Sequence, residues 1–285
     1  MCLPSPILSI KLSDRLINMP IFEAADAAIY FETTGAGDPL VLIPGFASGL
    51  WSWKHQKDEL AKHFQVIAFD PPGIASSKII GEASVSIERI ADDVAALLDD
   101  LGIDKAHVLG TSFGGFVAQD LALRYPDRVN KLVLACTSYG GKGHVLPSMD
   151  ILAAFASTKG LNSKERIRQF LTVAFTPEFV TNSPDIVDDF CLLREQNNVP
   201  EAVYMDQLLS ATTFDLSSRV AEIRAETLVL TGDNDTVVPM QNSINLATAL
   251  PNGRLETVAG GSHMFFVEQA DKFNSIVTEF LKDTK

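Results

Sequence analysis

Three kinds of residue in this chain could together perform nucleophilic chemistry, and the first is a serine between glycines. Ser112 lies in the run Gly110-Thr111-Ser112-Phe113-Gly114, between an apolar stretch typical of a strand (107–109) and one typical of a helix (116–125). A hydroxyl becomes a strong nucleophile when a sharp strand-to-helix turn exposes it next to a base. The glycines on either side allow the two backbone segments to approach where a Cβ would clash. The pattern therefore makes Ser112 the candidate nucleophile.

A histidine near the end of the chain is the candidate base. His263 lies in the glycine-rich stretch 259–266, between the apolar run 255–258 and a final helical pattern. A loop at the carboxyl end of the last strand is where an open α/β sheet places a catalytic residue, so we expect His263 to face Ser112. The other histidines are expected elsewhere. His55 and His63 should lie on a solvated helix, His107 inside a strand, and His144 at the start of a helical region.

An orienting acid is needed to hold the imidazole, and two aspartates are candidates. Asp233 and Asp235 lie in the stretch 230–239, which also follows a buried strand. They cannot point the same way, so one is expected to orient the imidazole and the other to cap the following helix. No carboxylate directly follows the strand that ends at Cys136, which removes an alternative acid position. The order serine, aspartate, histidine is that of the strand–serine–helix architecture.

Attack on a carbonyl places negative charge on its oxygen, and two backbone N–H groups are predicted to stabilise that charge. One belongs to Phe113, directly after the serine. The other belongs to Phe46, in the loop 44–49 after the first parallel strand, where Gly45 permits a close turn. Each such donor contributes about 3–4 kcal/mol to transition-state stabilisation. Alone, Pro44-Gly45 indicates only a turn at a strand end, but beside the candidate triad it predicts an oxyanion hole.

The strands that must position these loops are indicated by continuous apolar runs, at 40–43, 66–69, 108–109, 132–135 and 228–230. Such runs are typical of strands buried on both faces of a parallel sheet. Helical patterns separate them, at 51–64, 86–101 and 116–125; the clearest has Ser86 as its N-cap and Gly102 just past its end. A hairpin is expected over 21–32. The alternation predicts βαβ units and a doubly wound α/β fold.

The alternation stops between residues 139 and 222, where four helix-like segments follow one another, at 149–157, 163–174, 184–195 and 200–212. We therefore expect a core of residues 19–138 and 223–285 and a helical cap of residues 139–222. Residues 1–18 are expected to be an N-terminal extension without the features of a secretory signal. One hypothesis is that translation starts at Met19.

Composition excludes several classes of function. The net charge of −13 over 285 residues argues against a nucleic-acid surface and against docking on anionic lipid. No stretch approaches the about 20 apolar residues that span a bilayer. The three cysteines form no zinc-like pattern, and their odd number favours a reducing compartment. We expect a cytoplasmic protein with a small-molecule substrate and neither a metal nor an organic cofactor.

Together these motifs resemble the α/β-hydrolase superfamily, in its cap-bearing branch of esterases and lactonases, from Pro20 to the C-terminus. In that family the acid lies three residues after the glycine of its motif, which implies Asp235 rather than Asp233. Two positions depart from the family pattern, Pro44 in place of histidine and Ala75 in place of a second glycine. The motifs that carry the resemblance are 43–46, 70–73, 110–115, 232–235 and 261–263.

The stretch from Val117 to Thr137 is especially similar to 3-oxoadipate enol-lactonase and its carboxylesterase relatives. This resemblance implies a substrate that carries a carboxylate and needs a cationic partner. The cap offers Lys142, Lys159, Arg166, Arg168 and Arg194.

The predicted function is a serine hydrolase of carboxylic esters or lactones that works through an acyl-enzyme. The same triad could pass the acyl group to peroxide, as a perhydrolase or cofactor-free haloperoxidase, or cleave carbon–carbon bonds. A non-enzymatic module that binds a ligand for signalling is a further alternative. The serine at position 112 excludes the nucleophilic aspartate of dehalogenases and epoxide hydrolases.

Overall fold

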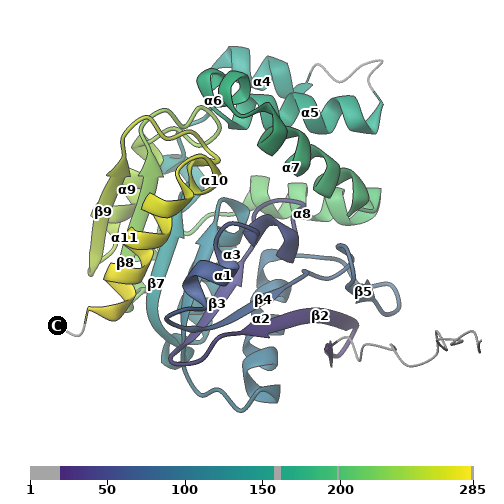
Figure 1. Cartoon of the computed structure of the whole chain (residues 1–285). Coiled ribbons are helices and arrows are strands. Elements are labelled where there is room, and N and C mark those ends of the chain that lie inside the picture. Colours follow the sequence, from purple (N-terminus) through teal and green to yellow (C-terminus); the bar gives the residue numbers. More distant parts are fainter. Residues whose placement is uncertain (1–19, 157–161, 198, 284–285) are drawn as a thin grey trace, which may run out of the picture.

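A mostly parallel β-sheet lies at the centre of the structure, a computed structural model that describes residues 20–156, 162–197 and 199–283 (Figure 1). Its strands follow the order β1-β2-β4-β3-β6-β7-β8-β9, with β5 paired to β2 beside this path. The pairings from β4 to β9 are parallel, whereas β2 is antiparallel to its three neighbours. The strands are β1 (Ile21–Glu23), β2 (Ala27–Thr34), β3 (Pro39–Ile43), β4 (Gln65–Phe69), β5 (Lys78–Ile79), β6 (Ala106–Thr111), β7 (Val129–Ala135), β8 (Glu226–Gly232) and β9 (Gly253–Val258).

Helices cover both faces of this sheet (Figure 1). Helices α2, α3 and α9 pack on one face, and α1, α10 and α11 on the other. The core helices are α1 (Lys57–Leu60), α2 (Ile87–Asp100), α3 (Phe113–Arg124), α9 (Gln241–Ala249), α10 (Phe265–Glu268) and α11 (Ala270–Lys282), and the 3₁₀ turns are η1 (Leu50–Trp53), η2 (Pro126–Arg128), η3 (Gly141–Gly143) and η4 (Val220–Glu222).

The predicted doubly wound α/β fold is confirmed, and strand β3 illustrates its physical basis. Val41 and Ile43 pack into the core on one face of the sheet, and Leu40 and Leu42 into the core on the other. All four are at most 1% exposed. Burial on both faces requires a continuous apolar run, which is the pattern that identified the strands. The hairpin is also confirmed, as is the N-cap of α2, where the Ser86 side chain accepts from the Arg89 N–H.

The single helix predicted over residues 51–64 is wrong. This segment forms η1 and the short α1 instead. Between them the backbone makes hydrogen bonds across three residues, such as that from the Gln56 N–H to the Trp53 carbonyl (2.9 Å). The fully buried Gln56 side chain donates to the Phe266 carbonyl, so a tertiary contact sets the backbone here. His55 is correspondingly half-buried and stacked on Phe190 rather than solvated, whereas His63 is exposed as predicted.

Between β7 and β8 the chain forms a group of helices above the carboxyl ends of the central strands (Figure 1). We call this group the insertion; it comprises α4 (Met149–Ala156), α5 (Ser163–Ala174), α6 (Pro177–Asn182), α7 (Pro184–Gln196) and α8 (Glu201–Thr213). Of these, α6 was not predicted. The proposed N-terminal extension 1–18 and Lys159 lie outside the described residues. No described helix is long and apolar enough to cross a membrane.

Candidate active site

The candidate nucleophile lies in a strained turn between β6 and α3. Ser112 has φ 52° and ψ −118°, a left-handed conformation that is unfavourable for residues with a Cβ. Its N–H donates to the Ala135 carbonyl at the end of β7 (2.8 Å) and its carbonyl accepts from Thr137 Oγ1, two residues beyond that strand (2.8 Å). A Cβ on Gly114 would lie 2.2 Å from the Ile43 carbonyl oxygen. Glycine is therefore required there for α3 to begin against β3.

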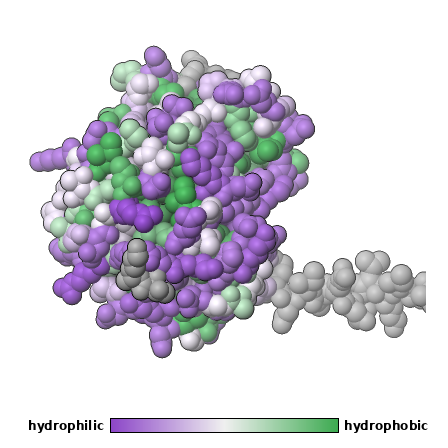
Figure 2. All heavy atoms as spheres, turned by 60° about the vertical axis from the view of Figure 1, so that its left-hand side comes forward, coloured by the Kyte–Doolittle hydropathy of each residue, from purple (hydrophilic) through white to green (hydrophobic). Residues whose placement is uncertain are grey.

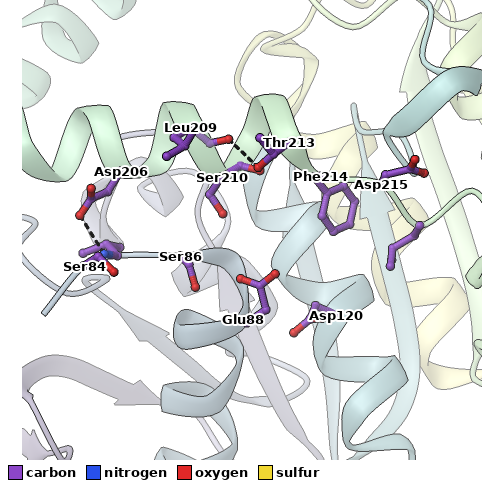
Figure 3. A pocket seen from close by; sticks show the side chains of 12 residues that line it. Ser84, Ser86, Glu88, Asp120, Asp206, Leu209, Ser210, Thr213, Phe214 and Asp215 are labelled. Atoms are coloured by element: carbon purple, nitrogen blue, oxygen red, sulfur yellow. Dashed lines mark hydrogen bonds between the residues drawn. The ribbon is translucent and has the colours of Figure 1, made fainter.

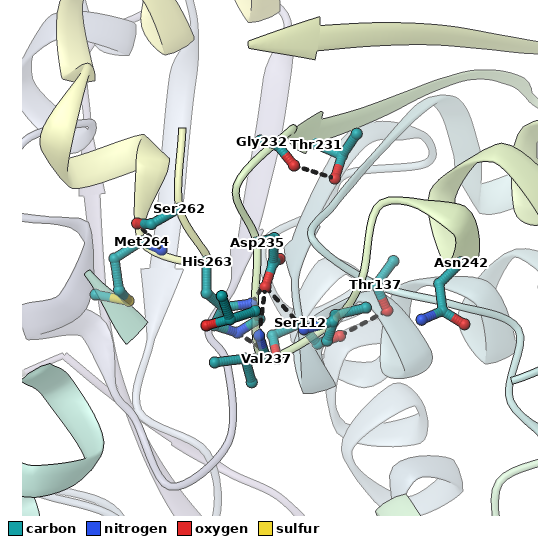
Figure 4. A network of polar contacts seen from close by, with 12 residues as sticks. Ser112, Thr137, Thr231, Gly232, Asp235, Val237, Asn242, Ser262, His263 and Met264 are labelled. Carbon is teal, nitrogen blue, oxygen red and sulfur yellow. Dashed lines mark hydrogen bonds and ion pairs between the residues drawn. The ribbon is translucent and has the colours of Figure 1, made fainter. Parts of the chain in front are cut away.

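The structure brings the three predicted triad side chains together (Figure 4). His263 Nδ1 lies 2.9 Å from Asp235 Oδ2, and His263 Nε2 lies 3.2 Å from Ser112 Oγ. Asp235 and His263 are buried, at 6% and 5% exposure, while Ser112 is partly exposed. An ionised carboxylate can only accept hydrogen bonds, so Nδ1 carries the proton and Nε2 presents its lone pair to the serine hydroxyl. This is the arrangement that a general base requires.

The two candidate acids have different partners in the structure. Asp235 faces His263 through Oδ2, and its Oδ1 accepts from the N–H groups of Val237 (2.9 Å) and Val238 (2.7 Å). Asp233 is exposed and accepts from the Gly260 N–H (2.7 Å). It therefore links the loop between β8 and α9 (233–240), which we call the acid loop, to the loop between β9 and α10 (259–264), which we call the histidine loop. The expectation that the second aspartate caps a helix is wrong, because α9 begins without a side-chain cap.

The predicted oxyanion donors belong to the residue that follows Ser112 and to the loop 44–49, whose Gly45 lies close to Ser112. Phe113 is the first residue of α3, where an N–H has no intrahelical acceptor. Within the described residues the Phe46 N–H has no acceptor either. A Cβ on Gly45 would lie 3.6 Å from Ser112 Cβ, an ordinary contact. The left-handed residue of this loop is instead Ala47, with φ 49°, so Gly45 is not the residue that makes the turn possible.

The insertion contacts the loops that carry the triad. The Met264 N–H, next to the candidate base, donates to the Ala174 carbonyl at the end of α5 (3.1 Å). Glu268 of α10 accepts from the N–H groups of Thr176 (2.6 Å) and Ser262 (3.0 Å). The histidine loop is therefore held between the core and the insertion.

Among the described cationic residues proposed as partners for a carboxylate, Arg194 contacts the loop 44–49, which we call the oxyanion loop. Its Nη1 donates to the Phe46 carbonyl and to Ser48 Oγ, both at 3.2 Å. Burial lowers the pKa of Arg194 to about 10, so the guanidinium is still protonated at neutral pH. Within the part of the chain that the structure describes, no carboxylate pairs with it. Lys142, Arg166 and Arg168 are exposed, and Arg168 pairs with Asp188.

The family is decided by a match over most of the chain. A family model described as the alpha/beta hydrolase fold matches residues 38–270. The chain belongs to the alpha/beta hydrolases. A relative from Burkholderia vietnamiensis strain G4, named 2-hydroxy-6-oxononadienedioate/2-hydroxy-6-oxononatrienedioate hydrolase, is 30% identical over 95% of this chain and 96% of its own length.

Solved structures agree with this assignment. A hydrolase from Pseudomonas aeruginosa PA01 superposes with a TM-score of 0.81 at 28% identity, covering 94% of this chain and 100% of the other. Est816, described as an N-acyl homoserine lactone degrading enzyme, superposes with a TM-score of 0.77 at 26% identity, covering 92% and 100%.

One residue of this hydrolase that sequence reasoning missed is Gln207. Its Oε1 accepts from the Ala47 N–H in the oxyanion loop (2.8 Å), and its side chain is 1% exposed. Val203, one turn earlier on α8, is also buried, at 3%. A glutamine on the buried face of a helix must find a polar partner. Because Gln207 lies four residues after the apolar Val203, the sequence could have indicated that it shares the buried face of this helix.

The surface of the hydrolase also has a cleft away from the triad. It encloses about 370 Å³ between α8 and the start of α2 and is lined by four carboxylates, those of Glu88, Asp120, Asp206 and Asp215 (Figure 3). None of Ser112, Asp235 and His263 lines it. The face of the molecule in Figure 2 is mainly hydrophilic, with apolar side chains exposed in patches between the polar ones.

Proposed function

We propose that this alpha/beta hydrolase is a serine hydrolase that cleaves a small ester or lactone through an acyl-enzyme. The observation that carries the proposal is the hydrogen-bonded series from Asp235 through His263 to Ser112. The lactone-degrading relative described above is consistent with this substrate class.

In the proposed reaction, Ser112 Oγ attacks the substrate carbonyl carbon while its proton passes to His263 Nε2. The N–H groups of Phe46 and Phe113 stabilise the oxyanion, and Asp235 stabilises the imidazolium. The tetrahedral intermediate then collapses, and His263 returns the proton to the leaving alkoxide. Water, deprotonated by His263, then attacks the acyl carbon. The second tetrahedral intermediate collapses, the bond from the acyl carbon to Ser112 Oγ breaks, and His263 returns the proton to Oγ as the acid leaves.

We further propose that the insertion acts as a cap and that Arg194 binds a carboxylate on the substrate. A protonated guanidinium that is partly buried and has no carboxylate partner among the described residues is a suitable site for such an anion. The Burkholderia vietnamiensis relative is named for a dioate, a substrate class that carries carboxylates.

Carbon–carbon bond hydrolysis is the second candidate. The same relative is named as a hydrolase of 6-oxo dienedioates and trienedioates, and Ser112 with His263 could attack a ketone carbonyl as well as an ester. A dienoate with a 6-oxo group is the test substrate, since its conjugated absorbance falls when the bond breaks.

The experiment combines active-site labelling with a substrate pair. A fluorophosphonate should label Ser112, identified by peptide mapping, and the wild type should hydrolyse aryl esters with and without a terminal carboxylate. Arg194→Met should raise KM for the carboxylate ester about 30-fold, which corresponds to the about 2 kcal/mol of a charged hydrogen bond. The neutral ester should keep its KM within about 3-fold.

Arg168→Met is the matched control, because Arg168 is exposed and already paired with Asp188, and it should behave as wild type. An unlabelled Ser112 in folded protein would refute the serine mechanism and favour a ligand-binding module. Faster product formation with added hydrogen peroxide would favour a perhydrolase.

A further inference from the structure

Two side chains of the insertion bind the same peptide group of the oxyanion loop. The group between Phe46 and Ala47 accepts at its carbonyl from Arg194 Nη1 (3.2 Å) and donates from its N–H to Gln207 Oε1 (2.8 Å). Gln207 lies 160 residues from Ala47 in sequence. Because the N–H can only donate, Gln207 must present its amide oxygen here. Both ends of one peptide group are therefore fixed from the insertion.

This peptide group is the centre of a strained turn. The Ser48 N–H donates to the Gly45 carbonyl (3.2 Å), so Phe46 and Ala47 occupy the two central positions of a four-residue turn. Ala47 has φ 49°, whereas φ of Phe46 is not positive. This combination is that of a type II turn, whose third position favours glycine. Turning the central peptide over would give Ala47 the negative φ that its Cβ prefers.

Gln207 and Arg194 oppose that change. In the overturned group the Ala47 N–H would face the guanidinium of Arg194, which has only donors to offer, so that contact would become repulsive. The Phe46 carbonyl would face the oxygen of Gln207, and the buried amide would have to turn over before it could donate to it. Relaxation of the turn also rotates the bond between Cα and the carbonyl carbon of Phe46, the residue whose N–H is the proposed oxyanion donor. Within the described residues Gln207 Nε2 has no hydrogen-bond partner. The bond that Gln207 Oε1 accepts from the Ala47 N–H is therefore the hydrogen bond that this buried amide makes among those residues.

We propose that Gln207 is a positioning residue, which holds the oxyanion loop in its strained turn so that the oxyanion hole is complete only with the insertion in place. The inference rests on the proposed serine hydrolase function. It predicts that Gln207 affects stabilisation of the tetrahedral transition state and not binding of the substrate.

The test compares two substitutions on a neutral aryl ester. Gln207→Met keeps the length of the side chain but removes the acceptor. It should lower kcat about 10- to 100-fold, which is less than the loss of kcat when an oxyanion donor is removed altogether. KM should stay within about 3-fold of the wild-type value. The affinity for an alkyl boronic acid, which forms a tetrahedral adduct on serine, should fall by a similar factor. Gln207→Glu keeps an acceptor for the Ala47 N–H and should retain about a third of kcat or more.

Ser210→Ala is the matched control. Ser210, which Figure 3 shows in the cleft beneath α8, also accepts from a core backbone N–H, that of Ile87 (3.0 Å). It should leave kcat and boronate affinity unchanged. Equal losses in Ser210→Ala and Gln207→Met, or wild-type kcat in Gln207→Met, would overturn the proposal. If the wild type neither hydrolyses esters nor reacts with fluorophosphonate, the proposed function fails; if it does both and Gln207→Met matches it, only the positioning role fails.

Discussion

Replacing Asp235 by asparagine should abolish the base function of His263 while leaving the fold intact. The two side chains have the same size, and the Asp235 side chain is fully buried. Its Oδ1 accepts from two N–H groups, those of Val237 and Val238. The single oxygen of asparagine will stay with these two donors, so its NH₂ group will face His263 Nδ1.

A donor at that position reverses the imidazole tautomer. Nδ1 must then accept, Nε2 carries the proton, and Nε2 can no longer take the proton of Ser112 Oγ, 3.2 Å away. Loss of the correct tautomer in a serine triad lowers kcat about 10⁴-fold, or about 5.4 kcal/mol at 1.36 kcal/mol for each tenfold change. We therefore expect Asp235→Asn to retain about 0.01% of wild-type kcat on an aryl ester.

Asp233→Asn is the matched comparison. Asp233 is exposed and accepts from the Gly260 N–H, and the oxygen of asparagine can keep that bond, so kcat should stay within about 3-fold. Thermal melting of both variants checks that they are folded. A larger loss of kcat in Asp233→Asn than in Asp235→Asn would show that the acid is misassigned, and more than about a tenth of wild-type kcat in Asp235→Asn would refute the tautomer reasoning.

Two further predictions concern stability. Burial raises the pKa of Asp93 from 3.8 to about 6. The folded protein therefore holds this proton to a higher pH than the unfolded chain does. As a result, the free energy of unfolding falls by up to about 3 kcal/mol as the pH rises from 4 to 6. Asp93→Asn should therefore melt above the wild type at pH 8 but not at pH 4, and a difference independent of pH would contradict the assignment. Gly114→Ala places a Cβ 2.2 Å from the Ile43 carbonyl oxygen and should cost about 3 kcal/mol or more in urea unfolding. Gly45→Ala, with its nearest contact at 3.5 Å, should cost less than about 1 kcal/mol, and equal midpoints for the two variants would count against this account.

The sheet and the loops that carry the candidate triad were predictable from sequence because both depend on local patterns, whereas the choice of Asp235 over Asp233 came from the resemblance to the family. Strands such as β3 are buried on both faces, which leaves a continuous apolar run, and the parallel sheet then brings Ser112, Asp235 and His263 to one edge. Gln56 and Gln207 were not predictable in the same way. Their partners, Phe266 and Ala47, lie 210 and 160 residues away. Where those partners lie depends on how whole helices dock, which no local spacing encodes.

The contacts between the insertion and the core limit how freely this molecule could be recombined with its relatives. The end of α5 accepts from the histidine loop and from the acid loop, through the carbonyls of Ala174 and Val173. Helices α7 and α8 hold the oxyanion loop through Arg194 and Gln207. A chimera that exchanged only the helices between β7 and β8 would gain a foreign insertion but lose these hydrogen bonds to the loops of the core. Grafting a foreign substrate preference onto this scaffold therefore requires the matching residues of all three loops to be carried along.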